Sequence, residues 1–154
     1  MIDTPHIVHT GEENTAVIHL TIQTSEMMTK FGPAVQELLA ELAKQGVAPS
    51  GSLFAYHLKM PGEVFDFELG FPVNAAVKAA GRVKPSKIPA FKAARTVYHG
   101  GYEGLPSAWG DFMKWVDTEG HKTAPVLVET YVTGPAAHPD PSSWRTELTR
   151  PLAE

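Results

Sequence analysis

The chain of 154 residues contains no cysteine, so disulfide bonds, thiolate catalysis and cysteine-ligated zinc are all excluded. Its amino terminus has neither the basic nor the apolar segment of a secretory signal. No apolar run approaches the roughly 20 residues that a membrane span needs. These absences predict a cytoplasmic protein that does not enter a membrane.

An excess of basic charge is also absent, since 13 lysines and arginines stand against 17 aspartates and glutamates, for a net charge of −4. Proteins that bind nucleic acids usually carry a basic stripe and a recognisable reading motif, so we expect no direct nucleic-acid binding. The seven histidines are dispersed, without the His-x-x-x-His spacing of a metal site. We therefore expect no metal and no other cofactor.

One short phrase occurs twice in the chain. FELGFPV spans residues 67–73 and TELTRPL spans residues 146–152, and both read Glu-Leu-x-x-Pro followed by valine or leucine. Each phrase closes a similar series of segments. The sequence therefore predicts an internal repeat.

The first half predicts a strand followed by a hairpin. AVIHLTIQ (16–23) is rich in β-branched residues, which favour strands. SLFAYHLKM (52–60) and VFDFELGFPV (64–73) follow, and Pro61-Gly62 between them is typical of a hairpin turn.

A helix is expected between the first strand and this hairpin. Gly46 marks its end, because glycine commonly follows the last helical turn. Pro33 predicts a break that leaves residues 26–30 as a separate helical piece. The apolar stripe of the helix consists of Phe31, Val35, Leu38, Leu39 and Leu42.

The second half predicts the same order of elements. FKAARTVYHG (91–100) indicates a strand, and APVLVETYVTG (124–134) and SWRTELTRPL (143–152) indicate a second hairpin with a longer, proline-rich loop. Gly120 ends the intervening helix. The apolar stripe of that helix consists of Leu105, Trp109, Phe112, Met113 and Val116.

These segments predict a single α+β domain over residues 1–154, made of two β-α-β-β repeats related by a pseudo-two-fold axis. Repeat one covers about residues 14–75 and repeat two about residues 90–152, with a linker over about residues 76–89. We expect an antiparallel sheet with both helices on one face and a ligand cleft between the repeats.

Alternation along the strands predicts where the carboxylates point. The apolar residues of 64–73 place Glu68 on the face away from the core, and Trp144 and Leu148 do the same for Glu147. If Val126, Val128 and Val132 mark the core side of their strand, its other side carries Leu127, Glu129 and Tyr131. We therefore expect Glu68, Glu129, Tyr131 and Glu147 to share the helix-free face.

Two interpretations of these glutamates remain open. The helix-free face of an antiparallel sheet is often wet, and glutamates there can simply be solvated. Leu127, Tyr131 and either Tyr56 or His57 near the same surface favour a ligand site instead. A carboxylate fenced by aromatic rings suits an organic cation, and the same desolvation also suits a general acid or base.

Three aromatic residues of the second helix are further candidates for a ligand pocket. Trp109 and Phe112 fit the apolar stripe, so packing in the core is their default interpretation. Trp115 lies off that stripe and is expected at the edge of the groove or over a loop.

The longest stretches that carry a family resemblance lie in the second half. TVYHGGYEGLPSAW (96–109), VETYV (128–132) and DPSSWRTELTRPL (140–152) resemble the GyrI-like domain, also called the AraC-type effector-binding domain. FDFELGFPV (65–73) is similar to the mid-domain signature of the same family. The resemblance covers nearly the whole chain, and its most specific part is the ending Trp-Arg-Thr-Glu-Leu-x-x-Pro-Leu.

The resemblance implies a stand-alone protein that binds small lipophilic, often cationic molecules in a cleft between the repeats. It implies that Glu147 is a buried charge partner for the ligand and that Tyr131 and Trp109 line the cavity. Together with the strand pattern, the expected ligand-binding residues are Glu147, Glu129, Tyr131, Glu68, Tyr56, Trp109, Trp115 and Phe112.

Two other functions occur among proteins that this chain resembles. Some relatives are hydrolases of strained cyclopropane-bearing toxins, for which Glu147 and Tyr131 would be the catalytic residues here. Others inhibit gyrase through protein contact, which implies a separate protein partner. The sequence leaves these functions open, and it is compatible with a monomer or a homodimer.

Overall fold

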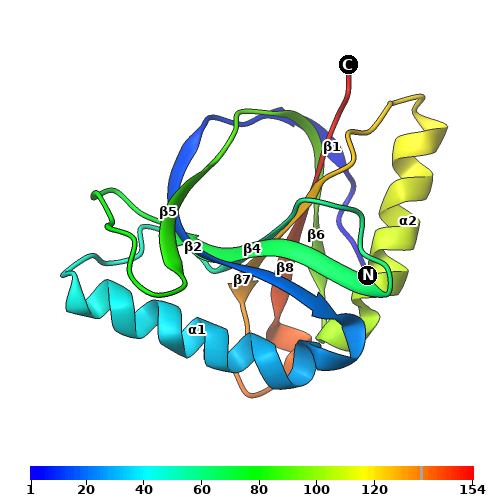
Figure 1. The fold of residues 1–154 in the computed structure, drawn as a ribbon. Coiled ribbons are helices and arrows are strands. Elements are labelled where there is room, and N and C mark those ends of the chain that lie inside the picture. Colours follow the sequence, from blue (N-terminus) through cyan, green and yellow to red (C-terminus); the bar gives the residue numbers. More distant parts are fainter. Residues whose placement is uncertain (136) are drawn as a thin grey trace. The chain divides into compact units, whose positions relative to one another are not determined.

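The computed structural model describes residues 1–135 and 137–154, with Met28 described by its backbone alone. The chain forms two compact units. We call Gly11–Ala90 the first-repeat unit, and Met1–Thr10 together with Phe91–Glu154 the second-repeat unit. Both are built from antiparallel strands and one long helix, which confirms the predicted α+β class (Figure 1).

The first-repeat unit has the strand order β3-β4-β2-β5. Its strands are β2 (Glu13–Gln23), β3 (Phe54–His57), β4 (Val64–Pro72) and β5 (Val83–Ile88). A 3-10 turn, η1 (Thr24–Glu26), leads into the helix α1 (Met27–Lys44). The hairpin predicted around Pro61-Gly62 is confirmed, because β3 and β4 pair in antiparallel register.

Helix α1 covers one face of these strands. It packs against β2, β4 and β5, and Figure 1 draws it in cyan along one side of β2 and β4. Leu20 and Ile22 of β2 are buried, whereas His19 and Thr21, which alternate with them, are exposed. The helix therefore lies on the side of Leu20 and Ile22, and His19 marks the helix-free side.

The predicted break at Pro33 is wrong. α1 runs without interruption from Met27 to Lys44, with Pro33 inside it. A proline normally clashes with the Cβ of the residue before it, which disfavours a helical conformation there. The preceding residue is Gly32, which has no Cβ, so this part of the penalty is relieved.

Both helices end in the same glycine-containing cap. Gly46 after α1 has φ of +70°, and Gly120 after the second helix has φ of +77°. The N–H of Val47 donates to the carbonyl of Leu42 at 2.9 Å, and the N–H of His121 donates to that of Val116 at 3.1 Å. These are Schellman-type bonds, and the predicted stop signals are confirmed.

The segment expected as a linker contains a strand. β5 pairs along its length with β2, from Glu13 opposite Ile88 to Ile18 opposite Val83. Its sequence, VKPSKI, was not predicted as a strand because it contains Pro85 and two lysines. Proline and lysine are tolerated in a strand at the edge of a sheet, and β5 is the last strand in the order of its unit.

The second-repeat unit has the strand order β1-β6-β8-β7. Its strands are β1 (His6–His9), β6 (Lys92–His99), β7 (Leu127–Thr133) and β8 (Arg145–Pro151). Its helix is α2 (Leu105–Thr118), preceded by the 3-10 turn η2 (Tyr102–Gly104), and a further turn, η3 (Pro141–Ser143), precedes β8. β7 and β8 form the second predicted hairpin.

Helix α2 and the strands β6 and β8 share a hydrophobic core. Phe112 and Leu148 are fully buried at its centre. The other buried members are Ala94, Tyr98, Ala108, Val116 and Leu152. Side chains in register with Leu148 therefore point toward α2. Within the described ranges, no helix is both long and apolar enough to cross a bilayer.

Candidate functional site

The carboxylate of Glu129 lies at the centre of a polar network in the second-repeat unit. The indole Nε1 of Trp109, on α2, donates a hydrogen bond to Oε2 of Glu129 at 2.7 Å. The hydroxyl of Tyr131, two residues along β7, donates to Oε1 at 2.8 Å. Each carboxylate oxygen is thus held by the polar atom of one aromatic ring.

This network lies on the helix side of the strands, so the predicted orientation of β7 is wrong. Glu129 is paired with Leu148 and Tyr131 with Thr146, and paired residues share a face. Leu148 belongs to the core under α2. The prediction took the valines as the core face, but Val132 is 51% exposed.

A helix-facing glutamate is tolerated because α2 supplies a hydrogen-bond donor to it. A polar group that leaves water needs a replacement partner, and the indole of Trp109 provides one. Hydrophobic patterning cannot reveal this, since it treats tryptophan only as an apolar residue of the helix stripe.

Burial controls the protonation of this network. Burial raises the pKa of the Glu129 carboxyl, and the hydrogen bonds from Trp109 and Tyr131 partly oppose this effect. The pKa of Tyr131 is raised well above its ordinary value, first by burial and then by the charge of Glu129. Tyr131 therefore remains a donor to Glu129 over the whole physiological range of pH.

Two further aromatic rings continue from Tyr131. The ring of Tyr102 lies edge-on to that of Tyr131 with centroids 5.7 Å apart, and the ring of Trp144 lies 4.9 Å from that of Tyr102. A Cβ placed on Gly134 would come within 2.6 Å of the Tyr102 hydroxyl, so a glycine leaves room for this ring. The result is an aromatic cluster beside a carboxylate, which we call the Glu129 site: Trp109, Tyr131, Tyr102, Trp144 and Glu129.

Neither Tyr102 nor Trp144 was predicted as a site residue. Tyr102 lies in η2, a short turn directly before α2, and Trp144 directly precedes β8. The signal for them was positional: each lies in a connection next to an element that contributes to the surroundings of β7, Tyr102 before α2 and Trp144 before the paired strand β8. That signal could be read only after the face of Glu129 was known.

Glu147 lies on the opposite face of β8. It is paired with Val97 and Thr130, and its neighbours Thr146 and Leu148 are fully buried on the helix side. Glu147 is therefore on the helix-free face, as predicted. Tyr131 is on the other face, so the predicted catalytic pair of Glu147 and Tyr131 is not brought together.

Glu147 already has a cationic partner. Nε of Arg95, on the neighbouring strand β6, lies 3.4 Å from Oε1 of Glu147. The side chain of Glu147 is 28% exposed and that of Arg95 is 27% exposed. The carboxylate predicted to attract a cationic ligand is thus half-buried and its charge is compensated within the unit.

Glu68 and Tyr56 form a third acidic position, in the first-repeat unit. Glu68 is paired with His19 and with Tyr56, so both glutamate and tyrosine are on the helix-free side, as predicted. Glu68 and Tyr56 are each 8% exposed, and the hydroxyl of Ser86 donates to Oε1 of Glu68 at 2.8 Å. Burial raises the pKa of Tyr56, and the charge of Glu68 adds to this effect.

His57 does not join Tyr56 on that surface. It is paired with Phe67, on the helix side, and its ring stacks on that of Phe67 with centroids 5.0 Å apart. Its Nδ1 is buried without a hydrogen-bond partner among the described residues. Burial lowers the pKa of His57 to about 4, so its ring is neutral at physiological pH.

The remaining candidates on α2 have separate places. Phe112 is fully buried in the core, and its ring lies 5.7 Å from that of Trp109. Trp115 packs against the same core and stacks on His121, with centroids 6.1 Å apart. Of the eight predicted residues, the structure therefore brings Glu129, Tyr131 and Trp109 together, with Phe112 behind them.

In the described part of the chain, no cluster of three or more His, Asp or Glu side chains could hold a metal ion. The cleft that the resemblance implies between the repeats stays a prediction.

Comparison with known proteins decides the family. A model of the GyrI-like small molecule binding domain matches residues 3–153. The chain belongs to this family. No curated protein matches the chain.

Solved structures share the fold of this chain. The crystal structure of the EcmrR C-terminal domain has a TM-score of 0.85 at 22% identity, covering 98% of this chain and 98% of that one. EcmrR in its complex with DNA has a TM-score of 0.84 at 25% identity, covering 97% of this chain. The chain spans 57% of the EcmrR chain in that complex.

Two more distant structures have the same fold with different printed descriptions. A hydrolase from Listeria innocua has a TM-score of 0.70 at 13% identity, covering 97% of this chain and 91% of its own. SAV2435, solved with bound tetraphenylphosphonium, has a TM-score of 0.62 at 8% identity, covering 97% of this chain and 94% of its own. At these identities the likeness extends to the fold alone.

Proposed function

We propose that this GyrI-like protein binds lipophilic organic cations at the Glu129 site. The observation that carries the proposal is that the Glu129 carboxylate has hydrogen-bond donors but no cation beside it among the described residues. Trp109 and Tyr131 satisfy the hydrogen-bonding capacity of its carboxylate with neutral groups, yet none of the ion pairs found among the described residues includes Glu129. Its negative charge therefore has no positive partner in that set.

An organic cation supplies what these neutral donors do not. Each carboxylate oxygen has a further lone-pair direction beyond the one used by its ring donor. A cation without N–H groups needs no acceptor of its own and gains Coulomb energy from a partly desolvated charge. Such a ligand matches a carboxylate whose hydrogen bonds are already made.

Aromatic rings favour the same class of ligand. Cation–π contact contributes about 0.5–2 kcal/mol per favourable ring, and planar groups gain further from stacking. Tyr131, Tyr102 and Trp144 form a continuous series of rings beside Glu129. Tetraphenylphosphonium, the ligand of the SAV2435 structure, has the required charge and aromatic surface.

The proposal is tested by titrating tetraphenylphosphonium and a rhodamine dye into the protein while following tryptophan fluorescence. Wild type should show saturable quenching, because Trp109 and Trp144 belong to the site. Glu129→Gln should weaken binding by about 10-fold or more, since it removes the Coulomb attraction between the cation and a partly desolvated carboxylate.

Glu147→Gln is the matched control for this titration. It removes a carboxylate that Arg95 already compensates, so its affinity for the cation should stay within about 2-fold of wild type. Saturable binding that depends on Glu147 and not on Glu129 would place the cation site at Glu147, the residue that the family resemblance implies. No saturable quenching in wild type would reject the proposal.

A second candidate is hydrolysis of a strained cyclopropane-bearing electrophile. The specific observation that favours it is the 2.8 Å hydrogen bond between Tyr131 and Glu129, whose raised pKa suits proton transfer. In this case Glu129 replaces Glu147 as the acid or base. Mass spectrometry should then detect a product larger than the substrate by one water. Glu129→Gln should abolish formation of this product. Stoichiometric binding without any product would reject hydrolysis and support binding as the function.

Roles beyond the site remain predictions of the family. A contact with gyrase or another separate protein partner would be tested by a pull-down with the purified partner. Localisation in the cytoplasm and a monomeric or dimeric state are likewise predictions.

A further inference from the structure

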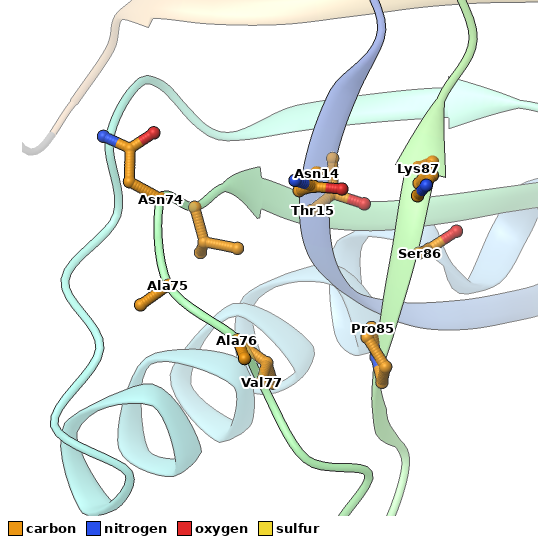
Figure 2. A pocket seen from close by; sticks show the side chains of 10 residues that line it. Asn14, Thr15, Asn74, Ala75, Ala76, Val77, Pro85, Ser86 and Lys87 are labelled. Atoms are coloured by element: carbon orange, nitrogen blue, oxygen red, sulfur yellow. The ribbon is translucent and has the colours of Figure 1, made fainter.

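A pocket of about 520 Å³ lies in the first-repeat unit, in a part of the chain that the proposed function does not use. It lies between the strands β2 and β5 and the loop that follows β4, as Figure 2 shows. This volume is in the range of about 300–1,000 Å³ that is typical of small-molecule sites. From its walls we infer that the pocket is a second ligand site, for a molecule with an apolar body and a carboxylate end.

The apolar part of the pocket comes from small and branched side chains. Val73 and Val77 are 5% and 8% exposed, and Pro85 on β5 lies across from Val77. Ala75 and Ala76 on the loop add two methyl groups. No aromatic and no acidic side chain is among the lining residues, in contrast to the Glu129 site.

The polar part of the pocket contains several hydrogen-bond donors and a single formal charge. Asn14 and Lys87 are paired across β2 and β5, so their side chains are neighbours on one face of this strand pair. Asn74 adds a second carboxamide from the loop. The ammonium of Lys87 is the only charged group in the lining.

The loop offers backbone donors as well. Among the hydrogen bonds found between described residues, none uses the N–H groups of residues 74–77, whereas the next N–H, of Lys78, donates to Gln45 Oε1 at 2.9 Å. Four successive N–H groups without an acceptor among the described residues, on the loop that lines the same pocket as Lys87, provide donors for an oxyanion.

The hydroxyl of Ser86 explains why the anion is placed toward Lys87 and the loop. Ser86 is paired with Thr15, on the strand face opposite to that of Asn14 and Lys87. Its proton is used in the hydrogen bond to the buried carboxylate of Glu68. An anion near Ser86 would be repelled by Glu68, so the carboxylate end of a ligand belongs on the side of Lys87.

Glu12 modulates this site. Its Oε1 lies 3.4 Å from Nζ of Lys87, and both side chains are largely exposed. A carboxylate ligand must share or replace this contact. Removing the charge of Glu12 should therefore strengthen ligand binding, whereas removing that of Lys87 should weaken it.

The test uses octanoate and its neutral analogue octanamide, followed by two-dimensional ¹H–¹⁵N NMR of the full chain. Octanoate should move the amide resonances of residues 74–77 in a saturable way, and octanamide should bind more weakly. Lys87→Met, which keeps the apolar stem, should weaken octanoate binding by about 3- to 10-fold, and Glu12→Gln should strengthen it by about 2- to 3-fold.

Lys84→Met is the matched control, because Lys84 is an exposed lysine of β5 that does not line the pocket. It should leave the octanoate affinity unchanged, as should Glu129→Gln, which separates this site from the proposed cation site. No saturable movement at residues 74–77 would reject the second site. Equal binding of octanamide, or equal effects of Lys84→Met and Lys87→Met, would reject the carboxylate preference.

Discussion

The hairpins of the two units have the same strand register, but different side chains occupy the equivalent positions. In each, the residues around the repeated glutamate are paired with the preceding strand of the hairpin in the same way. The corresponding pairs are Ala55–Leu69 and Glu129–Leu148, and His57–Phe67 and Tyr131–Thr146. The position of Glu129 in the second-repeat unit is thus an alanine in the first.

Because of this difference, these positions form packed core in the first-repeat unit and part of the Glu129 site in the second-repeat unit. Ala55 is fully buried, and His57 is packed between the rings of Phe65 and Phe67. The equivalent positions in the second-repeat unit hold a carboxylate and a phenol that bond to each other. The scaffold therefore repeats, while among the described residues only the second-repeat unit holds a carboxylate–phenol pair at these helix-side positions.

The two repeated glutamates also differ in their surroundings. Glu68 and Glu147 occupy equivalent positions on the helix-free side of their strands. Glu68 is 8% exposed and accepts a hydrogen bond from Ser86, whereas the side chain of Glu147 is 28% exposed and is paired with Arg95. Their electrostatic environments are set by residues on other strands, outside the repeated phrase.

The strongest test of the comparison is to place a glutamate in the first-repeat unit at the position equivalent to Glu129. Ala55→Glu puts a carboxylate at a fully buried position of β3, paired with the equally buried Leu69. We expect it to lower the free energy of unfolding by about 4 kcal/mol or more, measured by urea denaturation. Glu129→Gln should cost much less, and a stable Ala55→Glu protein would show that the two helix sides are equally permissive.

The second test concerns the buried histidine of the first-repeat unit. The pKa of His57 is about 4 in the folded chain against 6.5 ordinarily, so the unfolded chain binds the proton first as pH falls. Stability should therefore be lost on acidification from about pH 6.5 to pH 4, by up to about 3 kcal/mol.

His57→Phe removes the titratable imidazole. It should flatten the dependence of stability on pH between about pH 4 and pH 6.5, as measured by thermal or urea denaturation. His9→Gln, at an exposed position, should leave the profile like that of wild type. An unchanged slope in His57→Phe would assign the acid sensitivity to other groups.

A smaller effect is expected from removing one donor of the acid network. Tyr131→Phe keeps the ring and deletes the hydroxyl bonded to Glu129. The loss should cost about 1–2 kcal/mol of stability, because a buried carboxylate oxygen loses a partner. It should also raise the pKa of Glu129 further, since this bond lowers it, and ¹³C NMR of the Glu129 carboxyl measures that directly.

The smallest effect is expected at the repeated glutamate of the second-repeat unit. Glu147→Gln should change stability by less than about 1 kcal/mol, because half-exposed ion pairs contribute little. A double-mutant cycle with Arg95→Met measures the coupling, which should decrease at high salt. A coupling of several kcal/mol would mean that Glu147 is the structurally decisive acid of this unit.

Much of the fold was predictable because it depends on local patterns. β-branched residues indicated the strand around Ile18, and glycines indicated the helix ends at Gly46 and Gly120. The strand β5 was missed because Pro85 and the lysines resemble a linker. They are compatible with a strand only at an edge, which is a property of the assembled sheet.

The sequence by itself determined that the chain repeats a β-α-β-β unit and that its acids recur at fixed strand positions, because these features depend on residue order and on neighbours in the chain. Only the tertiary structure decided which partners each acid meets. Glu129, on the helix side of β7, accepts a hydrogen bond from Trp109 of α2, and Glu147, on the other face of β8, lies beside Arg95 of β6. Contacts between residues distant in the chain set the charge of each site, and no local pattern encodes them.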